Sequence, residues 1–226
     1  MNARILATTI ACSGLALAAQ ATTWDLTSQY QAAAANGVNG AWSYGEISGG
    51  NGGTFSSLGW TPVVSPLAAG IYGTGNGAFV YQNTASFAAY GIAPGQVTLE
   101  SDLGNAAVQW TAPSTGVYDI VAAIGGTTAT EWNGYGNNFA QFAGLNINGV
   151  SQGSSLVNNV KNWDITDVSL AAGQTIDVYV LNPGYANGGN TQTELAITSV
   201  PDGGMTISLL GGALAGLGAL RRKPSL

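Results

Sequence analysis

The sequence predicts an all-β protein built as a jelly-roll β-sandwich, on three observations. Short apolar segments with a period of two residues recur along the chain, as half-buried strands require. Clusters of Gly, Asn and Ser separate these segments and supply turns. Between the two chain ends no stretch has a convincing 3.6-residue period, so the core is expected to consist of strands. The 226 residues are enough for one domain.

Nine strands are predicted. The alternation is clearest in Val117–Ile124 and Thr175–Leu181, where apolar side chains occupy every second position. The others are Trp42–Ile47, Ala78–Gln82, Val97–Leu99, Ala107–Thr111, Phe139–Ile147, Trp163–Leu170 and Glu194–Val200. One helical turn is expected at Gln29–Ala35, because the Gly- and Asn-rich stretch after it opposes a longer helix.

The N-terminal segment 1–21 is predicted to be a secretory signal peptide. Arg4 is its only charged residue, and the apolar run Ile5–Ala18 follows. The tripeptide Ala19, Gln20 and Ala21 follows. Its two alanines are the small residues that signal peptidase requires at positions −3 and −1, so the mature chain is expected to begin at Thr22. The apolar run is too short to span ~30 Å of hydrocarbon as a permanent helix. A buried N-terminal helix is the alternative.

Missing residue types exclude several kinds of chemistry. Cys12, within the signal peptide, is the only cysteine, so the mature chain has no disulfide, no cysteine nucleophile and no thiolate metal site. The chain has no histidine, which excludes the Ser-His-Asp mechanism and the commonest zinc ligands.

Charge is distributed unevenly. Between the signal peptide and the tail, the sequence has ten acidic residues and a single basic residue, Lys161. The net charge of this segment is therefore −9. Such a surface repels phosphate backbones, so nucleic acid is excluded as a partner.

The C-terminal 27 residues, 200–226, consist of three parts. The first is the pentapeptide Val200, Pro201, Asp202, Gly203 and Gly204, which neither a helix nor a strand can continue through. An uncharged apolar segment, 205–220, then predicts a short transmembrane helix. Arg221, Arg222 and Lys223 form a stop-transfer cluster in the basic tail 221–226.

This order of motif, short helix and basic cluster resembles the PEP-CTERM class of bacterial sorting signals, in its Val-Pro-Asp variant. The resemblance implies an exported protein of a Gram-negative bacterium, at the envelope, cell surface or extracellular matrix. It also implies that an exosortase, a membrane transpeptidase, recognises Val200–Gly204 as its substrate, so that membrane attachment through 205–220 is transient. A plain C-terminal membrane anchor is the alternative.

The domain itself, 22–199, resembles a jelly roll found in PEP-CTERM proteins. The matching segments are Trp24–Leu26 (WDL), Asn36–Gly45 (NGVNGAWSYG), Val108–Tyr118 (VQWTAPSTGVY), Leu145–Gly149 (LNING) and Val168–Asp177 (VSLAAGQTID). They imply a fold like that of carbohydrate-binding modules.

A carbohydrate ligand is predicted at the loop Gly125–Asn138. Aromatic faces stack on sugar rings and amides bond their hydroxyls, and this loop supplies both groups. The candidate residues are Glu131, Trp132, Asn133, Tyr135, Asn137 and Asn138. Tyr185 is a weaker companion in the loop 182–190. Ordinary turn chemistry is the alternative explanation for a loop rich in Asn and Gly.

The remaining candidates have structural explanations. Trp42, Trp110 and Trp163 lie in strand patterns and are predicted core residues, whereas Trp60 is expected in a loop. Carboxylates that could serve glycoside hydrolysis or hold a structural Ca²⁺ are Glu100, Asp102, Glu131, Asp164 and Asp167. No catalytic residue, cofactor or metal ligand is assigned among them.

The sequence therefore predicts an exported, non-enzymatic protein that associates with extracellular polysaccharide. A structural matrix or adhesion protein without a specific sugar ligand is the first alternative, and a secreted glycoside hydrolase the second.

Overall fold

The computed structural model describes residues 20–31, 37–49, 52–61, 71–73, 77–88, 92–101, 104–125, 142–156, 160–181, 190–201 and 211. The chain forms two compact units: Ala21–Val200, and Met1–Gln20 together with Pro201–Leu226. The second unit lies almost entirely outside the described residues, so the signal peptide and the tail helix stay predictions. Within the described ranges, no helix is long and apolar enough to cross a membrane.

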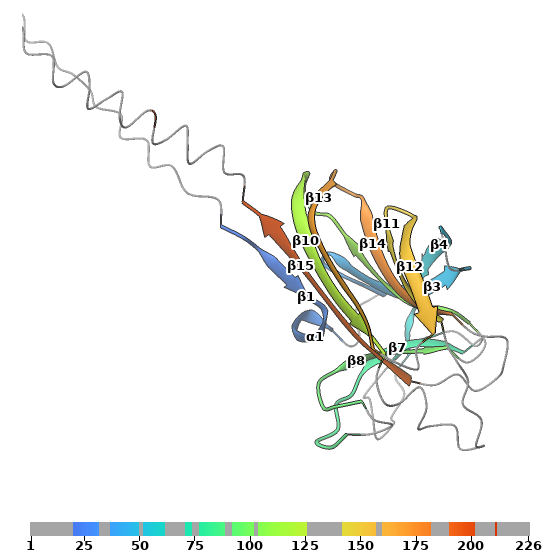
Figure 1. Cartoon of the computed structure of the whole chain (residues 1–226). Coiled ribbons are helices and arrows are strands. Elements are labelled where there is room, and N and C mark those ends of the chain that lie inside the picture. The colour runs from blue at the N-terminus through green and yellow to red at the C-terminus, as the bar shows by residue number, and fades with distance from the viewer. Residues whose placement is uncertain are drawn as a thin grey trace, which may run out of the picture. The chain divides into compact units, whose positions relative to one another are not determined.

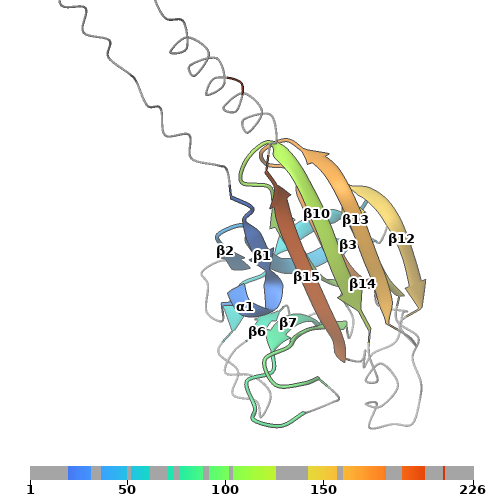
Figure 2. The same cartoon turned by 60° about the vertical axis from the view of Figure 1, so that its left-hand side comes forward.

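Two antiparallel sheets form the layers of the unit Ala21–Val200 (Figures 1 and 2). In the described residues, sheet A runs in the order β13 (Lys161–Leu170), β10 (Gly116–Ile124), β15 (Asn190–Val200), β8 (Val97–Ser101), β7 (Ala78–Gln82), β6 (Ile71–Gly73) and β5 (Trp60–Thr61), with β1 (Thr23–Asp25) also paired to β15. Sheet B runs β12 (Val150–Leu156), β11 (Phe142–Ile147), β14 (Thr175–Leu181), β9 (Ala106–Thr111), β3 (Trp42–Ser48) and β2 (Val38–Asn39), with β4 (Thr54–Ser57) also paired to β3. The predicted jelly-roll β-sandwich is confirmed.

All nine predicted strands are present, and β7 and β14 have the predicted bounds. The six strands β1, β2, β4, β5, β6 and β12 were not predicted. Most have two to four residues, too few to show an alternation. The longer β12 reads VSQGSSL, a polar sequence that a strand with β11 as its single described partner tolerates.

Two sequence predictions differ from the described structure. The described helical turn is α1 (Leu26–Gln29), which begins before the predicted Gln29–Ala35, because Asp25 caps it by accepting a hydrogen bond from the Ser28 amide at 2.7 Å. Tyr30, with ψ of 130°, ends it, and residues 32–35 of the predicted turn lie outside the described residues. Trp60 does not lie in a loop but begins β5, which pairs with β6.

An aromatic cluster fills the core between the sheets. Trp42, Trp110 and Trp163 are 2%, 0% and 6% exposed, which confirms them as core residues. The Trp110 ring lies 5.3 Å from that of Trp24 and 5.2 Å from that of Tyr118, both edge to face. This arrangement is favourable for aromatic pairs and ties β1, β9 and β10 together.

A carboxyl group is buried on the outward face of sheet B. Asp177 alternates with the core residues Ile176 and Val178, so it points away from the core, yet it is only 3% exposed. On this face Phe55 of β4 packs with Ile47, Ala107 and Tyr179 in a second apolar cluster. Burial raises the pKa of Asp177, although a 2.8 Å hydrogen bond donated by Gln109 Nε2 opposes the rise.

We expect Asp177→Asn to stabilise the protein at neutral pH. A raised pKa in the folded state means that the carboxyl favours folding when protonated and that this contribution is lost as pH rises through the folded pKa. The asparagine keeps an oxygen for Gln109 without the buried charge. The melting temperature of the variant should exceed that of the wild type at pH 7, and the gain should shrink as pH falls towards 3.8, the ordinary pKa of the group. A gain independent of pH would contradict this explanation.

Candidate functional site

The predicted carbohydrate loop joins the two sheets. It follows Ile124, the last residue of β10 in sheet A, and leads to Phe142, the first of β11 in sheet B. The candidates Glu131, Trp132, Asn133, Tyr135, Asn137 and Asn138 lie outside the described residues, as does Tyr185.

The strand register places the ends of this loop beside those of two others. Ile124 pairs with Thr193 near the start of β15 and with Lys161 at the start of β13. Phe142 pairs with Leu181, which ends β14, and with Leu156, which ends β12. The segments 125–141, 157–160 and 182–189 therefore leave the sandwich at one end. We call it the loop end.

The chain leaves the sandwich at the opposite end. Val200 ends β15 and pairs with Val117 of β10. On its other side β15 pairs with β1, where the Thr22 amide donates to Ser199 Oγ and the Ser199 amide donates to the Thr22 carbonyl, both at 2.8 Å. The seven steps from Thr193 to Val200 cover about 24 Å at ~3.4 Å each. Both ends of the unit Ala21–Val200 thus lie at one end, which we call the exit end.

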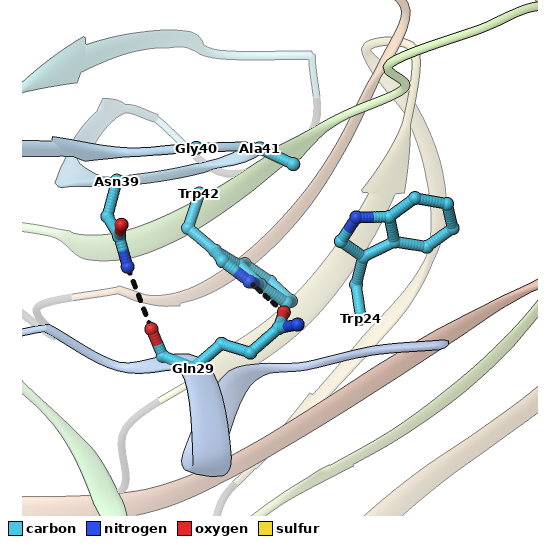
Figure 3. A pocket seen from close by; sticks show the side chains of 6 residues that line it. All are labelled: Trp24, Gln29, Asn39, Gly40, Ala41 and Trp42. Atoms are coloured by element: carbon cyan, nitrogen blue, oxygen red, sulfur yellow. Dashed lines mark hydrogen bonds between the residues drawn. The ribbon is translucent and has the colours of Figure 1, made fainter. Parts of the chain in front are cut away.

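A cleft in the described residues lies near the exit end, with a volume of about 390 Å³ (Figure 3). Its lining residues are Trp24, Gln29, Asn39, Gly40, Ala41 and Trp42. They come from β1, the end of α1 and the hairpin between β2 and β3. Asn39 pairs with Trp42, which leaves a two-residue turn, and Gly40 has the positive φ of 59° that such turns favour.

Gln29 is the centre of this cleft. Its Oε1 accepts a hydrogen bond from Trp42 Nε1, and its backbone carbonyl accepts one from Asn39 Nδ2, each at 2.8 Å. The amide nitrogen of Gln29 is on the side that faces Trp24 (Figure 3). Within the described residues, neither Gln29 Nε2 nor Trp24 Nε1 has a hydrogen-bond partner. None of the described residues that line the cleft carries a charge.

This cleft was not predicted from the sequence. Trp24 and Asn39 were noted only as parts of segments that resemble a jelly-roll domain. Their separation in the sequence did not indicate that they line one cavity. The single available signal was the concentration of aromatic and amide residues in 24–42.

Two described carboxylates serve the fold. Asp25 caps α1, and Asp119 accepts the amide hydrogen of Asp167 at 3.0 Å. Asp167, with φ of 59°, lies in a β-bulge where the register of β10 and β13 shifts. In the described ranges, no group of three or more Asp, Glu, His or Cys residues could hold a metal. Asp102 and Glu131 lie outside these ranges.

The protein is a jelly-roll β-sandwich, and its last described strand, β15, is followed without a linker by a sorting motif. Residues 199–223 match the VPDSG-CTERM motif, which confirms the predicted Val-Pro-Asp variant. Gly203 occupies the position of the serine in the name of the motif. None of the curated proteins compared with the chain matches it.

Similar solved structures are carbohydrate-binding modules. TmCBM61 in complex with β-1,4-galactotriose is 14% identical, with a TM-score of 0.37 over 57% of this chain and 87% of the module. A CBM36 module in complex with calcium and xylotriose is 13% identical, with a TM-score of 0.31 over 57% and 92%. A mutant family 29 module is 9% identical, with a TM-score of 0.33 over 79% and 92%. The fold assignment itself rests on the two sheets.

Proposed function

We propose that this protein is exported, displayed at the cell surface and associated with extracellular polysaccharide, without enzymatic activity. The observation that supports this best is that the sorting motif and the predicted carbohydrate loop begin at opposite ends of the sandwich. The sorting motif begins where β15 ends, whereas the predicted carbohydrate loop starts at the loop end. The start of that loop and the start of the sorting motif therefore lie at opposite ends of the sandwich.

Sorting is the first part of this proposal. Val200–Gly204 is the substrate of an exosortase-type transpeptidase in the envelope of a Gram-negative bacterium, and 205–220 is the transient membrane helix. The VPDSG-CTERM match supports the role of the motif. Because Val200 is still paired in the sheet, the domain continues up to the first residue of the motif without a linker.

Polysaccharide binding is the second part. Trp132 and Tyr135 supply stacking faces, and Asn133, Asn137 and Asn138 supply hydrogen-bond donors and acceptors for hydroxyl groups. Glu131 adds one acceptor. The neighbouring segment 182–189 carries Tyr185 and leaves the sandwich beside this loop.

Replacing Trp132 by Ala is expected to abolish the retention of the full-length protein on a glycan array, because the variant loses the largest stacking face. Phe87→Ala is the matched control, since it removes an aromatic side chain that is 58% exposed and belongs to a different connection, the one between β7 and β8. Retention should be unchanged in the control. If the wild type binds no neutral or acidic glycan, or if Trp132→Ala binds normally, the carbohydrate proposal fails. The matrix or adhesion role without a sugar ligand then takes its place.

A further inference from the structure

We propose that the cleft between Trp24, Gln29, Asn39 and Trp42 is a second binding site, which takes one neutral pyranose residue. The proposal deepens the carbohydrate function proposed above but uses different residues at the exit end. Its support is a cavity of about 390 Å³, a size typical of small-molecule sites, with an indole facing an amide.

The chemistry of the lining favours an uncharged, hydroxylated ligand. An indole offers an apolar face or edge to the C–H groups of a sugar ring. Gln29 Nε2 is a donor and Asn39 Oδ1 an acceptor, so the cleft offers both kinds of partner to the hydroxyl groups of a ligand, which accept and donate. Because the six described lining residues are all uncharged, an ionic ligand gains no ion pair with them.

The site is preorganised by the fold. Gln29 is fixed by the hydrogen bonds from Trp42 and Asn39, which use its two oxygens and leave its amide nitrogen for a ligand. Trp24 is fixed by its edge-to-face contact with buried Trp110 and by strand pairing with Ile197. A ligand therefore meets groups whose conformational entropy has already been lost, which favours affinity.

Nuclear magnetic resonance of the ¹⁵N-labelled full-length protein in detergent tests the proposal. The sequence contains six tryptophans, so Trp24→Phe and Trp132→Phe assign the indole signals of the cleft and of the loop. The probes are methyl β-glucopyranoside, methyl β-galactopyranoside and methyl α-mannopyranoside, with methyl β-glucuronide as the charged comparison. We expect the Trp24 signal to shift saturably with at least one neutral probe and less with the glucuronide.

Gln29→Glu is the decisive variant. It keeps an oxygen for the Trp42 indole but replaces the donor that faces Trp24 by a charged acceptor. We expect the affinity measured at the Trp24 signal to fall about tenfold, with little change in melting temperature. Gln152→Ala, an exposed glutamine replaced on β12, should leave the affinity unchanged.

The two proposals fail in distinguishable ways. A Trp24 signal that no probe moves overturns the cleft site, even if the Trp132 signal responds and supports the loop. A Trp24 response without a Trp132 response supports the cleft and opposes the loop. Equal binding of the glucuronide, or unchanged affinity in Gln29→Glu, overturns the assignment to neutral sugars.

Discussion

A chain that ends at Val200 is expected to be released into the medium as a folded protein, whereas the full-length protein stays with the cell envelope. The truncation removes the rest of the sorting motif, the apolar segment 205–220 and the basic cluster, but leaves every residue of β15 in place. Fractionation of cells and medium, with detection of the protein in each, measures the difference. If both chains remain with the envelope, the tail does not determine retention.

A second truncation, at Glu194, is the control for the fold boundary. It deletes the part of β15 that pairs with β1, together with the fully buried Ile197 and the 1% exposed Leu195. We expect this chain not to fold, because β1 loses its partner strand and the core loses two apolar side chains. Protease resistance of the Val200 truncation, and its absence in the Glu194 truncation, would place the end of the domain at the start of the motif.

Trp110→Ala is expected to cost about 3–5 kcal/mol of unfolding free energy, at the upper end of what a single core substitution costs. Trp110 is fully buried, lies opposite Trp42 in the sheet and contacts the rings of Trp24 and Tyr118. For a domain of this size the loss corresponds to a fall in melting temperature of roughly 6–20 °C.

Trp110→Phe provides the comparison. The Trp110 indole N–H has no hydrogen-bond partner among the described residues, so phenylalanine removes an unsatisfied donor while it keeps an aromatic ring. We expect a cost smaller than that of Trp110→Ala, because the remaining ring leaves a smaller cavity. Calorimetry of both variants measures the two effects, and equal costs would show that the ring contacts are not what stabilises this position.

Much of the fold could be predicted because local pattern and final burial agree. In β14, apolar residues at every second position became the core face, and the turn at Asn148 and Gly149 formed where that dipeptide predicts it, with φ of 49° and 75°. The short strands were missed because two or three residues cannot show a period. Their pairing depends on partners such as β15, which is distant in sequence from β1.

The candidate sites show the same division. The loop at Gly125–Asn138 could be proposed from composition, because stacking and amide groups lie together in one segment. The cleft could not, because Trp24 and Asn39 line one cavity only after β1 has paired with β15, the last described strand, and β2 with β3. Likewise, no sequence pattern indicates that Asp177, which alternates with core residues on β14, is only 3% exposed.

By itself, the sequence determined the all-β class, the exclusion of histidine and cysteine chemistry, and the sorting motif, because composition, period and motif order are local properties. The tertiary structure decided that the sandwich continues to the first residue of that motif, that the predicted ligand loop starts at the opposite end, and that an uncharged cleft forms beside the exit of the chain. These features depend on which distant strands pair and in which register, since pairing fixes where each side chain and each loop lies.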